Sequence, residues 1–91
     1  MNIATLESLP IEVNQALDLI LSGNTLPFSQ DGLEFKNRER ALPVKKPKYY
    51  REYTVLTPNS ITRGTRRLVL GKGKEMYYTE DHYNSFTAIS H

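Results

Sequence analysis

Apolar residues recur at helical spacing once in this chain, near its N-terminus. The i, i+3, i+4, i+7, i+8 pattern of a helix with one buried face is followed by Val13, Ala16, Leu17, Ile20 and Leu21. This pattern predicts a helix over residues 8–23, with Ser8 as its N-cap, Pro10 in its first turn and Gly23 at its end. The helix carries no side chain suited to chemistry, so we assign it to the core.

After residue 24 the pattern changes to short runs of β-forming residues separated by turns. The clearest run is Tyr49 to Val55, in which Tyr50, Glu52 and Thr54 share one face of an extended strand. Further short strands are expected at residues 33–35, 67–70, 76–78 and 85–89. One helix followed by about five short antiparallel strands predicts an α+β fold, with the N-terminal helix packed on a small sheet.

The length and the residue types narrow the classes of protein that remain. A chain of 91 residues suits one domain, so we expect residues 1–91 to form a single domain. The chain has no cysteine, and its two histidines, His82 and His91, do not make a convincing metal site. We therefore expect no metal and no cofactor. No apolar run approaches the roughly 20 residues of a membrane span, and the N-terminus lacks the pattern of a secretory signal.

The charges are distributed unevenly along the chain. All twelve Lys and Arg residues lie between Lys36 and Lys74, a segment with two acids, Glu39 and Glu52, and a net charge of +10. The flanking segments hold the other eight acids and no basic residue. Such asymmetry favours a polyanionic partner, with RNA or DNA as the first candidate. The alternative is a solvated basic face that binds nothing.

Glu52 and His82 are the residues best suited to acid–base chemistry. Glu52 projects from a strand, which is a rigid mount, and the surrounding positive charge favours its ionised form. His82 follows Glu80 and Asp81, whose charges favour its protonated form. An ionised base facing a protonated acid suits ester chemistry at phosphorus. The alternatives are that Glu52 only pairs with a nearby arginine and that His82 is a surface residue without a role.

Three arginines in five positions could bind phosphate. Arg63, Arg66 and Arg67 carry planar guanidinium groups that match phosphate oxygens in pairs. On a strand Arg66 and Arg67 point to opposite faces, so at most one of them shares a face with Arg63. Aromatic side chains beside polar clusters can stack on unpaired bases, and Phe35 and Tyr83 are the best placed.

Five blocks of residues occur in the order and spacing of one family. The chain resembles the guanyl-specific microbial ribonucleases of the barnase superfamily, nearest their small streptomycete branch, over roughly residues 9–89. The blocks are Gln30–Gly32, Phe35–Glu39, Tyr50–Val55, Thr62–Arg67 and Tyr77–Tyr83. The resemblance implies the microbial ribonuclease fold. It also implies cleavage of single-stranded RNA after guanosine, through a 2′,3′-cyclic phosphate that is then hydrolysed to a 3′-phosphate without a metal.

The resemblance also implies roles for single residues. Glu52 matches the general base that takes the 2′-OH proton, and His82 matches the general acid that protonates the departing 5′-oxygen. Arg63 and Arg67 match the arginines that hold the scissile phosphate. The guanine site implied in this way comprises Gln30, Phe35, Lys36, Asn37, Arg38, Glu39 and Tyr83.

Within that guanine site each group has an expected contact. The Glu39 carboxylate would accept hydrogen bonds from guanine N1–H and the exocyclic amine, while the backbone N–H groups of residues 36–38 would address O6 and N7. Phe35, with the Arg38 side chain and Tyr83, would sandwich the base. A guanine reader and a general base would thus account for the two acids inside the basic segment.

The family pattern predicts partners and also leaves alternatives. We expect a secreted monomer that binds single-stranded RNA, no membrane, and an acidic inhibitor protein of the barstar type. One alternative is a non-catalytic module that binds single-stranded RNA. Another is the same nuclease acting as the toxin domain of a larger delivered protein.

Two departures from the family pattern carry predictions. Without the disulfide that ties the two ends in many relatives, residues 1–8 should be held loosely. Lys36, Lys45, Lys46 and Lys48 add charge beyond the pattern, which predicts a steep salt dependence of RNA binding.

Overall fold

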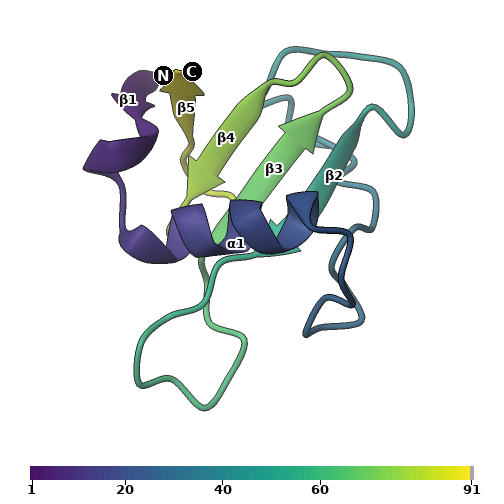
Figure 1. Cartoon of the computed structure of the whole chain (residues 1–91). Helices are drawn as coiled ribbons and strands as arrows, with labels where there is room; N and C mark the ends of the chain where they lie inside the picture. The colour runs from purple at the N-terminus through teal and green to yellow at the C-terminus, as the bar shows by residue number, and fades with distance from the viewer. Residues whose placement is uncertain (91) are drawn as a thin grey trace.

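The structure, a computed structural model, describes residues 1–90. One α-helix, α1 (Ile11–Leu21), follows a single 3-10 turn, η1 (Leu6–Ser8), and crosses one face of a five-stranded sheet (Figure 1). The strands are β1 (Asn2–Thr5), β2 (Tyr50–Thr54), β3 (Arg67–Gly71), β4 (Met76–Thr79) and β5 (Thr87–Ser90). Their order in the sheet is β1-β5-β4-β3-β2, and the α+β class is confirmed.

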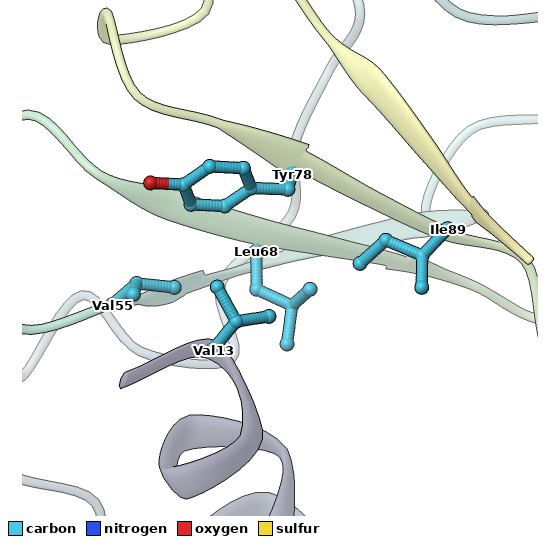
Figure 2. Close-up of a cluster of buried hydrophobic side chains, with 5 residues drawn as sticks. All are labelled: Val13, Val55, Leu68, Tyr78 and Ile89. Atoms are coloured by element: carbon cyan, nitrogen blue, oxygen red, sulfur yellow. The ribbon is translucent and has the colours of Figure 1, made fainter. Parts of the chain in front are cut away.

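The main apolar core lies between α1 and the sheet (Figure 2). Val13 of α1 is fully buried against Leu68 in the middle of β3. Because Leu68 pairs with Tyr53 of β2 and with Tyr78 of β4, the three side chains form one row on the helix face of the sheet. Val55 and Ile89 complete this cluster, which we call the helix-face core.

The opposite face of the same strands, which we call the site face, holds a second cluster. Its buried apolar members are Leu42, Tyr50, Val69, Tyr77 and Phe86. Beside them runs a polar row, since Arg67 of β3 pairs with Thr54 of β2 and with Thr79 of β4. These three are the buried polar or charged residues of the described chain. The predicted shared face of Tyr50, Glu52 and Thr54 is the site face.

The helix is shorter than the predicted range of 8–23. Pro10 occupies the N-cap position, and the Ser8 hydroxyl donates to the Thr5 carbonyl at 2.8 Å instead of capping α1. At the other end Gly23 has the left-handed φ of 74°, as its expected role as a stop requires. Leu21 was assigned to the buried stripe, but it is 74% exposed. Of the five residues in that stripe it lies farthest round the helix from Val13, and the helix ends at Leu21.

Two strands differ from the prediction. Residues 33–35 form an isolated bridge, Glu34 to Arg51, that covers the edge of β2 without becoming a strand. The fifth strand is β1, which was not predicted because its four residues are mostly exposed and show no alternation. It pairs with β5 in parallel, so the sheet is mixed and not purely antiparallel. The N-terminus lies beside the C-terminal strand (Figure 1), so the prediction of a loosely held N-terminus is wrong for residues 2–5.

Candidate active site

Glu52 and Arg63 are joined at the centre of the candidate site. Glu52 projects from the middle of β2, and its Oε1 accepts a 3.2 Å hydrogen bond from Nη2 of Arg63. Nε of Arg63 donates to Oγ1 of Thr54 at 2.7 Å. The side chains of Glu52 and Arg63 keep 20% and 19% of their surface exposed, so a substrate can still reach both. Glu52 therefore pairs with an arginine, and this pairing lies in the site and not away from it.

Asp31 forms an ion pair with Arg63, and the sequence analysis did not include it among the site residues. Its side chain is 3% exposed, and Oδ1 lies 3.8 Å from Nη2 of Arg63. The same oxygen accepts a 2.7 Å hydrogen bond from the backbone N–H of Thr54, while Oδ2 accepts one from Phe28. Asp31 therefore fixes the end of β2 and the guanidinium together. Its place within the Gln30–Gly32 block was a possible signal, but that block reads as a turn in the sequence.

Arg67 is a buried cation without a carboxylate partner among residues 1–90. It is 3% exposed, and its Nη1 donates only to the carbonyls of Gly64 and Arg66, at 3.0 and 2.7 Å. Its Nε has no hydrogen-bond partner in the described chain. Burial lowers the pKa of Arg67, and the positive charge of Arg63 lowers it further. A buried, unpaired guanidinium beside a second one is a costly arrangement that an anionic ligand would relieve.

Arg66, the neighbour of Arg67, points to the other side of the sheet. Its Nη1 lies 3.4 Å from Oε1 of Glu12 on α1. The sequence predicted that at most one of the two arginines would share a face with Arg63. The structure places Arg67 on the site face and Arg66 on the helix face.

His82 lies in a tight turn after β4. His82 and Tyr83 have left-handed φ values of 54° and 75°, which are unfavourable for residues other than glycine. The backbone N–H of His82 donates to the Thr65 carbonyl at 3.0 Å, and Oγ1 of Thr65 donates to the Glu80 carbonyl at 2.8 Å. These two bonds attach the His82 turn to the loop that carries Arg63 and leads into Arg67, the first residue of β3. His82 is exposed, and the centre of its imidazole ring lies 4.9 Å from the centre of the Tyr83 ring.

Asp81 holds this strained turn in place. Its Oδ2 accepts a 2.6 Å hydrogen bond from the Ser85 hydroxyl, and its Oδ1 accepts one from the Thr79 hydroxyl at 2.8 Å. The backbone N–H of Tyr83 in turn donates to Oγ1 of Thr79 at 3.1 Å. The hydrogen bonds from Ser85, then Thr79, lower the pKa of Asp81. Sequence reasoning treated Asp81 only as a charge beside His82, because these bonds appear only in the folded turn.

A cavity of about 360 Å³ opens beside Glu52 and His82. Its lining includes the backbone segment Lys36–Glu39, whose four N–H groups take part in none of the hydrogen bonds among the described residues. The side chain of Asn37 shapes this segment by exchanging hydrogen bonds of 2.9 and 3.0 Å with the backbone of Leu42. Asn37 itself is left-handed, with φ of 52°. A row of free donors around a cavity suits a ligand rich in acceptors, such as a base edge.

Most of the predicted base-binding residues line this cavity, with two differences. The rings of Phe35 and Tyr83 stack directly on each other, 4.8 Å apart and 30° from parallel. No base fits between them as they stand, so a base would rest on the outside of this aromatic pair. Gln30 does not line the cavity; it is exposed in the turn before β2, where its carbonyl accepts the N–H of Leu33.

Tyr83 also places a hydroxyl close to the charged groups. This hydroxyl has no hydrogen-bond partner within residues 1–90, as is also true of Nε of Arg67. Burial raises the pKa of Tyr83, and the negative charge of Glu52 raises it further. Tyr83 therefore remains a neutral donor, and its pKa also responds to the positive charges of Arg67 and Arg63.

Residues 1–90 contain no group of three or more His, Asp or Glu side chains that could hold a metal ion. His91, the second histidine of the sequence, lies outside the described residues. Of the helices in residues 1–90, none has the length and apolar character needed to cross a membrane.

A family model described as ribonuclease matches residues 2–90. This chain belongs to the ribonuclease family. Guanyl-specific ribonuclease Sa of Kitasatospora aureofaciens is 51% identical over 85 residues, which are 92% of this chain and 88% of that protein. Guanyl-specific ribonuclease St of Saccharopolyspora erythraea is 49% identical over 81 residues, 89% of this chain and 80% of that protein. The resemblance stated from the sequence is confirmed.

Solved structures of a related ribonuclease support the same assignment. A structure of ribonuclease Sa2 in complex with mononucleotides superposes with a TM-score of 0.95 at 41% identity, covering 100% of this chain and 95% of that one. Another structure, of ribonuclease Sa2 with 3′-GMP, has a TM-score of 0.91 at 40% identity and covers 99% of this chain and 97% of that one. The microbial ribonuclease fold expected from the sequence is therefore confirmed.

Proposed function

We propose that this chain is an endoribonuclease that cuts single-stranded RNA on the 3′ side of guanosine. The observation that carries the proposal is that Glu52 and His82 line one cavity that also exposes free backbone donors. Arg63 is hydrogen-bonded to Glu52, and Arg67 lies on the same face of the sheet, opposite Thr54. The 49–51% identity to the guanyl-specific ribonucleases Sa and St supports it, as does the similarity to ribonuclease Sa2 structures with mononucleotides. We also propose that residues 1–91 act as one ribonuclease domain.

The chemistry follows from where the charges lie. Glu52, held in its orientation by Arg63, takes the proton from the 2′-OH, and the 2′-oxygen attacks phosphorus. The bond to the 5′-oxygen breaks, and His82 gives that oxygen a proton. Arg63 and Arg67 bind the non-bridging oxygens, whose negative charge grows in the transition state, so Arg67 gains the anion that it lacks in the free protein. The product is a 2′,3′-cyclic phosphate.

The second step reverses the proton transfers. His82, now neutral, takes a proton from water, which attacks the cyclic phosphate, while Glu52 returns a proton to the departing 2′-oxygen. This step leaves a guanosine 3′-phosphate. The mononucleotide in the ribonuclease Sa2 structure named above, 3′-GMP, is the same kind of product. Every proton in the scheme moves through Glu52 or His82.

Guanine recognition is assigned to the segment Lys36–Glu39. We propose that the free backbone N–H groups of Lys36, Asn37 and Arg38 donate to guanine O6 and N7, and that Glu39 accepts from N1–H and the amine. Adenine offers no such pair of donors, so binding adenine would leave the Glu39 carboxylate unpaired. The stacked Phe35–Tyr83 pair supports the base from one side, and the Arg38 side chain covers it.

The finer expectations about partners are proposals of the same kind. We propose that the protein acts as a secreted monomer and that an acidic inhibitor of the barstar type covers its basic cleft. The exposed cations beside the cavity, among them Lys36 and Arg38, suit carboxylates that take the place of phosphates. Size-exclusion chromatography and the salt dependence of inhibitor binding would test these two points.

The direct test of function is cleavage of the dinucleoside phosphates GpC, ApC, UpC and CpC under identical conditions. We expect GpC to be cut far faster than the other three. The analogue with 2′-deoxyguanosine should remain intact, because it lacks the attacking hydroxyl. If single-stranded RNA binds but none of the four is cut, the non-catalytic binding module replaces the enzyme.

A further inference from the structure

A second cavity lies behind the guanine-recognition segment. Its volume is about 480 Å³, and it is lined by residues 34–38, Arg40 and residues 44–50; we call it the lysine groove. The groove shares residues 34–38 with the cavity of about 360 Å³ beside Glu52 and His82, which we call the guanine cavity, so this segment is the wall between them. Glu52 and His82 line the guanine cavity and not the groove. The proposed reaction therefore leaves the lysine groove without a role.

The charge of the groove is strongly one-sided. Among the described residues that line it, the one carboxylate is that of Glu34, whose Oε2 accepts a 2.7 Å hydrogen bond from the backbone N–H of Lys48. None of the cations of the groove takes part in an ion pair within residues 1–90, and all are exposed. These cations are Lys36, Arg38, Arg40, Lys45, Lys46 and Lys48. Six unpaired cations around one concave surface attract a polyanion more than single lysines scattered on a surface would.

The backbone of the groove is held by specific contacts. The hydroxyl of Tyr50 donates to the Pro43 carbonyl at 2.6 Å, and the N–H of Tyr49 donates to the Lys46 carbonyl at 3.2 Å. Tyr49 is fixed in turn by its 2.6 Å hydrogen bond to Glu75 of the β3–β4 hairpin, and Nζ of Lys45 lies 5.3 Å above its ring. The lysines therefore extend from an ordered loop, and a ligand need not order that loop first.

We propose that the lysine groove binds phosphates of the RNA strand on the 5′ side of the guanosine. This inference rests on the proposed function, because it takes the guanine position from it. In that reaction His82 protonates the departing oxygen, so the 3′ part of the substrate leaves on the His82 side. The 5′ part is free to cross the wall formed by residues 34–38, beyond which the six cations lie.

The test compares two double variants that remove equal charge. Lys46→Gln with Lys48→Gln removes two of the six cations of the groove, while Lys72→Gln with Lys74→Gln removes two from the β3–β4 hairpin, which lies outside it. Lys48 and Lys74 both have left-handed φ values, 67° and 71°. The two double variants are therefore matched in backbone conformation as well as in the charge that they remove. The ligands are oligonucleotides with one 2′-deoxyguanosine, which cannot be cut, extended by three uridines on either the 5′ or the 3′ side.

Binding of the uncut oligonucleotides is measured against salt. Removing two phosphate contacts should raise the Kd of the 5′-extended ligand about tenfold near 50 mM salt and make the salt slope shallower by about 1.4. The hairpin variant should bind like the wild type, and the 3′-extended ligand should not distinguish the two variants. Equal losses in both variants, or a loss seen only with the 3′ extension, would overturn the proposal.

Cleavage of GpC by the wild type is recorded separately. GpC has no 5′ extension, so its cleavage tests the ribonuclease function without the groove. If GpC remains uncut, the proposed function fails, while the binding comparison still decides whether the groove takes the 5′ strand. If GpC is cut and the groove variant binds every ligand as the wild type does, only the groove proposal fails.

Discussion

The two faces of the sheet differ by a single step along each strand. On the helix face, Leu68 is fully buried between Tyr53 and Tyr78 and packs under α1. One residue earlier on β3, Arg67 lies on the site face between Thr54 and Thr79. The helix face uses its buried row for apolar packing. The adjacent row on the site face buries a cation, Arg67, that has no carboxylate partner among residues 1–90.

The helix face therefore mainly stabilises the fold, and the site face mainly serves the chemistry. Burial of apolar side chains under α1 stabilises the sheet, and the site face can then keep polar groups that are unfavourable in the free protein. The loops of the site face also contain left-handed residues, Asn37, His82 and Tyr83, held by side-chain hydrogen bonds. Substitutions on the site face should therefore change turnover, and those on the helix face should change the free energy of unfolding.

The largest effect is expected from Glu52→Gln and His82→Gln. Each substitution keeps the size of the side chain but removes the proton transfer, so kcat for GpC should fall by about 10²–10⁴-fold. The thermal unfolding midpoint should stay close to that of the wild type, because both side chains are at least partly exposed. Near-normal turnover in either variant would remove that residue from its proposed role.

Arg67→Gln compared with Arg66→Gln gives the sharpest contrast between the faces. Loss of Arg67 should lower kcat by about 10²–10³-fold through lost stabilisation of the transition-state charge. Loss of Arg66 removes a part-exposed ion pair with Glu12 and should cost less than about 1 kcal/mol of stability, with unchanged turnover. If Arg67→Gln changes only KM, the guanidinium binds substrate without a special role in the transition state.

Leu68→Ala tests the helix face. Leu68 is fully buried, so the substitution should lower the free energy of unfolding by about 2–5 kcal/mol in urea titrations. The kcat of the folded protein, measured well below its unfolding midpoint, should change little. The matched substitution is Val69→Ala, one residue along and directly opposite Glu52, which should lower both stability and kcat. A loss of kcat in Leu68→Ala as large as in Val69→Ala would contradict the separation of the two faces.

The smallest effect is expected from Asp81→Asn, on the pH dependence of the free energy of unfolding. Because hydrogen bonds from Ser85 and Thr79 lower the pKa of Asp81, the carboxylate stabilises the fold at pH values above the ordinary aspartate pKa. That contribution should be lost as the pH falls through the lowered pKa of the folded state. Asp81→Asn should therefore remove part of the loss of stability that sets in as the pH falls below the ordinary aspartate pKa, about 4.

Turnover of the same variant tests the link to His82. The left-handed turn should loosen without the Asp81 carboxylate, so kcat should fall by a few-fold and KM for GpC should change less. A pH–stability curve identical to that of the wild type would show that Asp81 does not hold the turn.

The sequence predicted those parts of the molecule that depend on local pattern. The helical period located α1, and strand alternation placed Glu52 and Thr54 on one face and separated Arg66 from Arg67. The family blocks then indicated which residues make up the candidate site. Each of these predictions needs only neighbours along the chain or residues quoted in one block.

The features that the sequence missed depend on distant or irregular contacts. Asp31 acts on Thr54 and Arg63, which are 23 and 32 positions away along the chain. β1 depends on pairing with β5 at the other end of the chain, and its four residues carry no apolar alternation. The stacking of Phe35 on Tyr83 and the lysine groove also arise only when separate loops meet. Such contacts have no periodic signature.

The time course of GpC cleavage, with products identified by mass, decides whether Glu52 and His82 carry out the chemistry. We predict that guanosine 2′,3′-cyclic phosphate appears first and is converted more slowly to guanosine 3′-phosphate, in the presence of EDTA as in its absence. We also predict that Glu52→Gln and His82→Gln slow both steps. Direct formation of the 3′-phosphate with no cyclic product, or activity that disappears with EDTA, would contradict the assignment of the chemistry to Glu52 and His82.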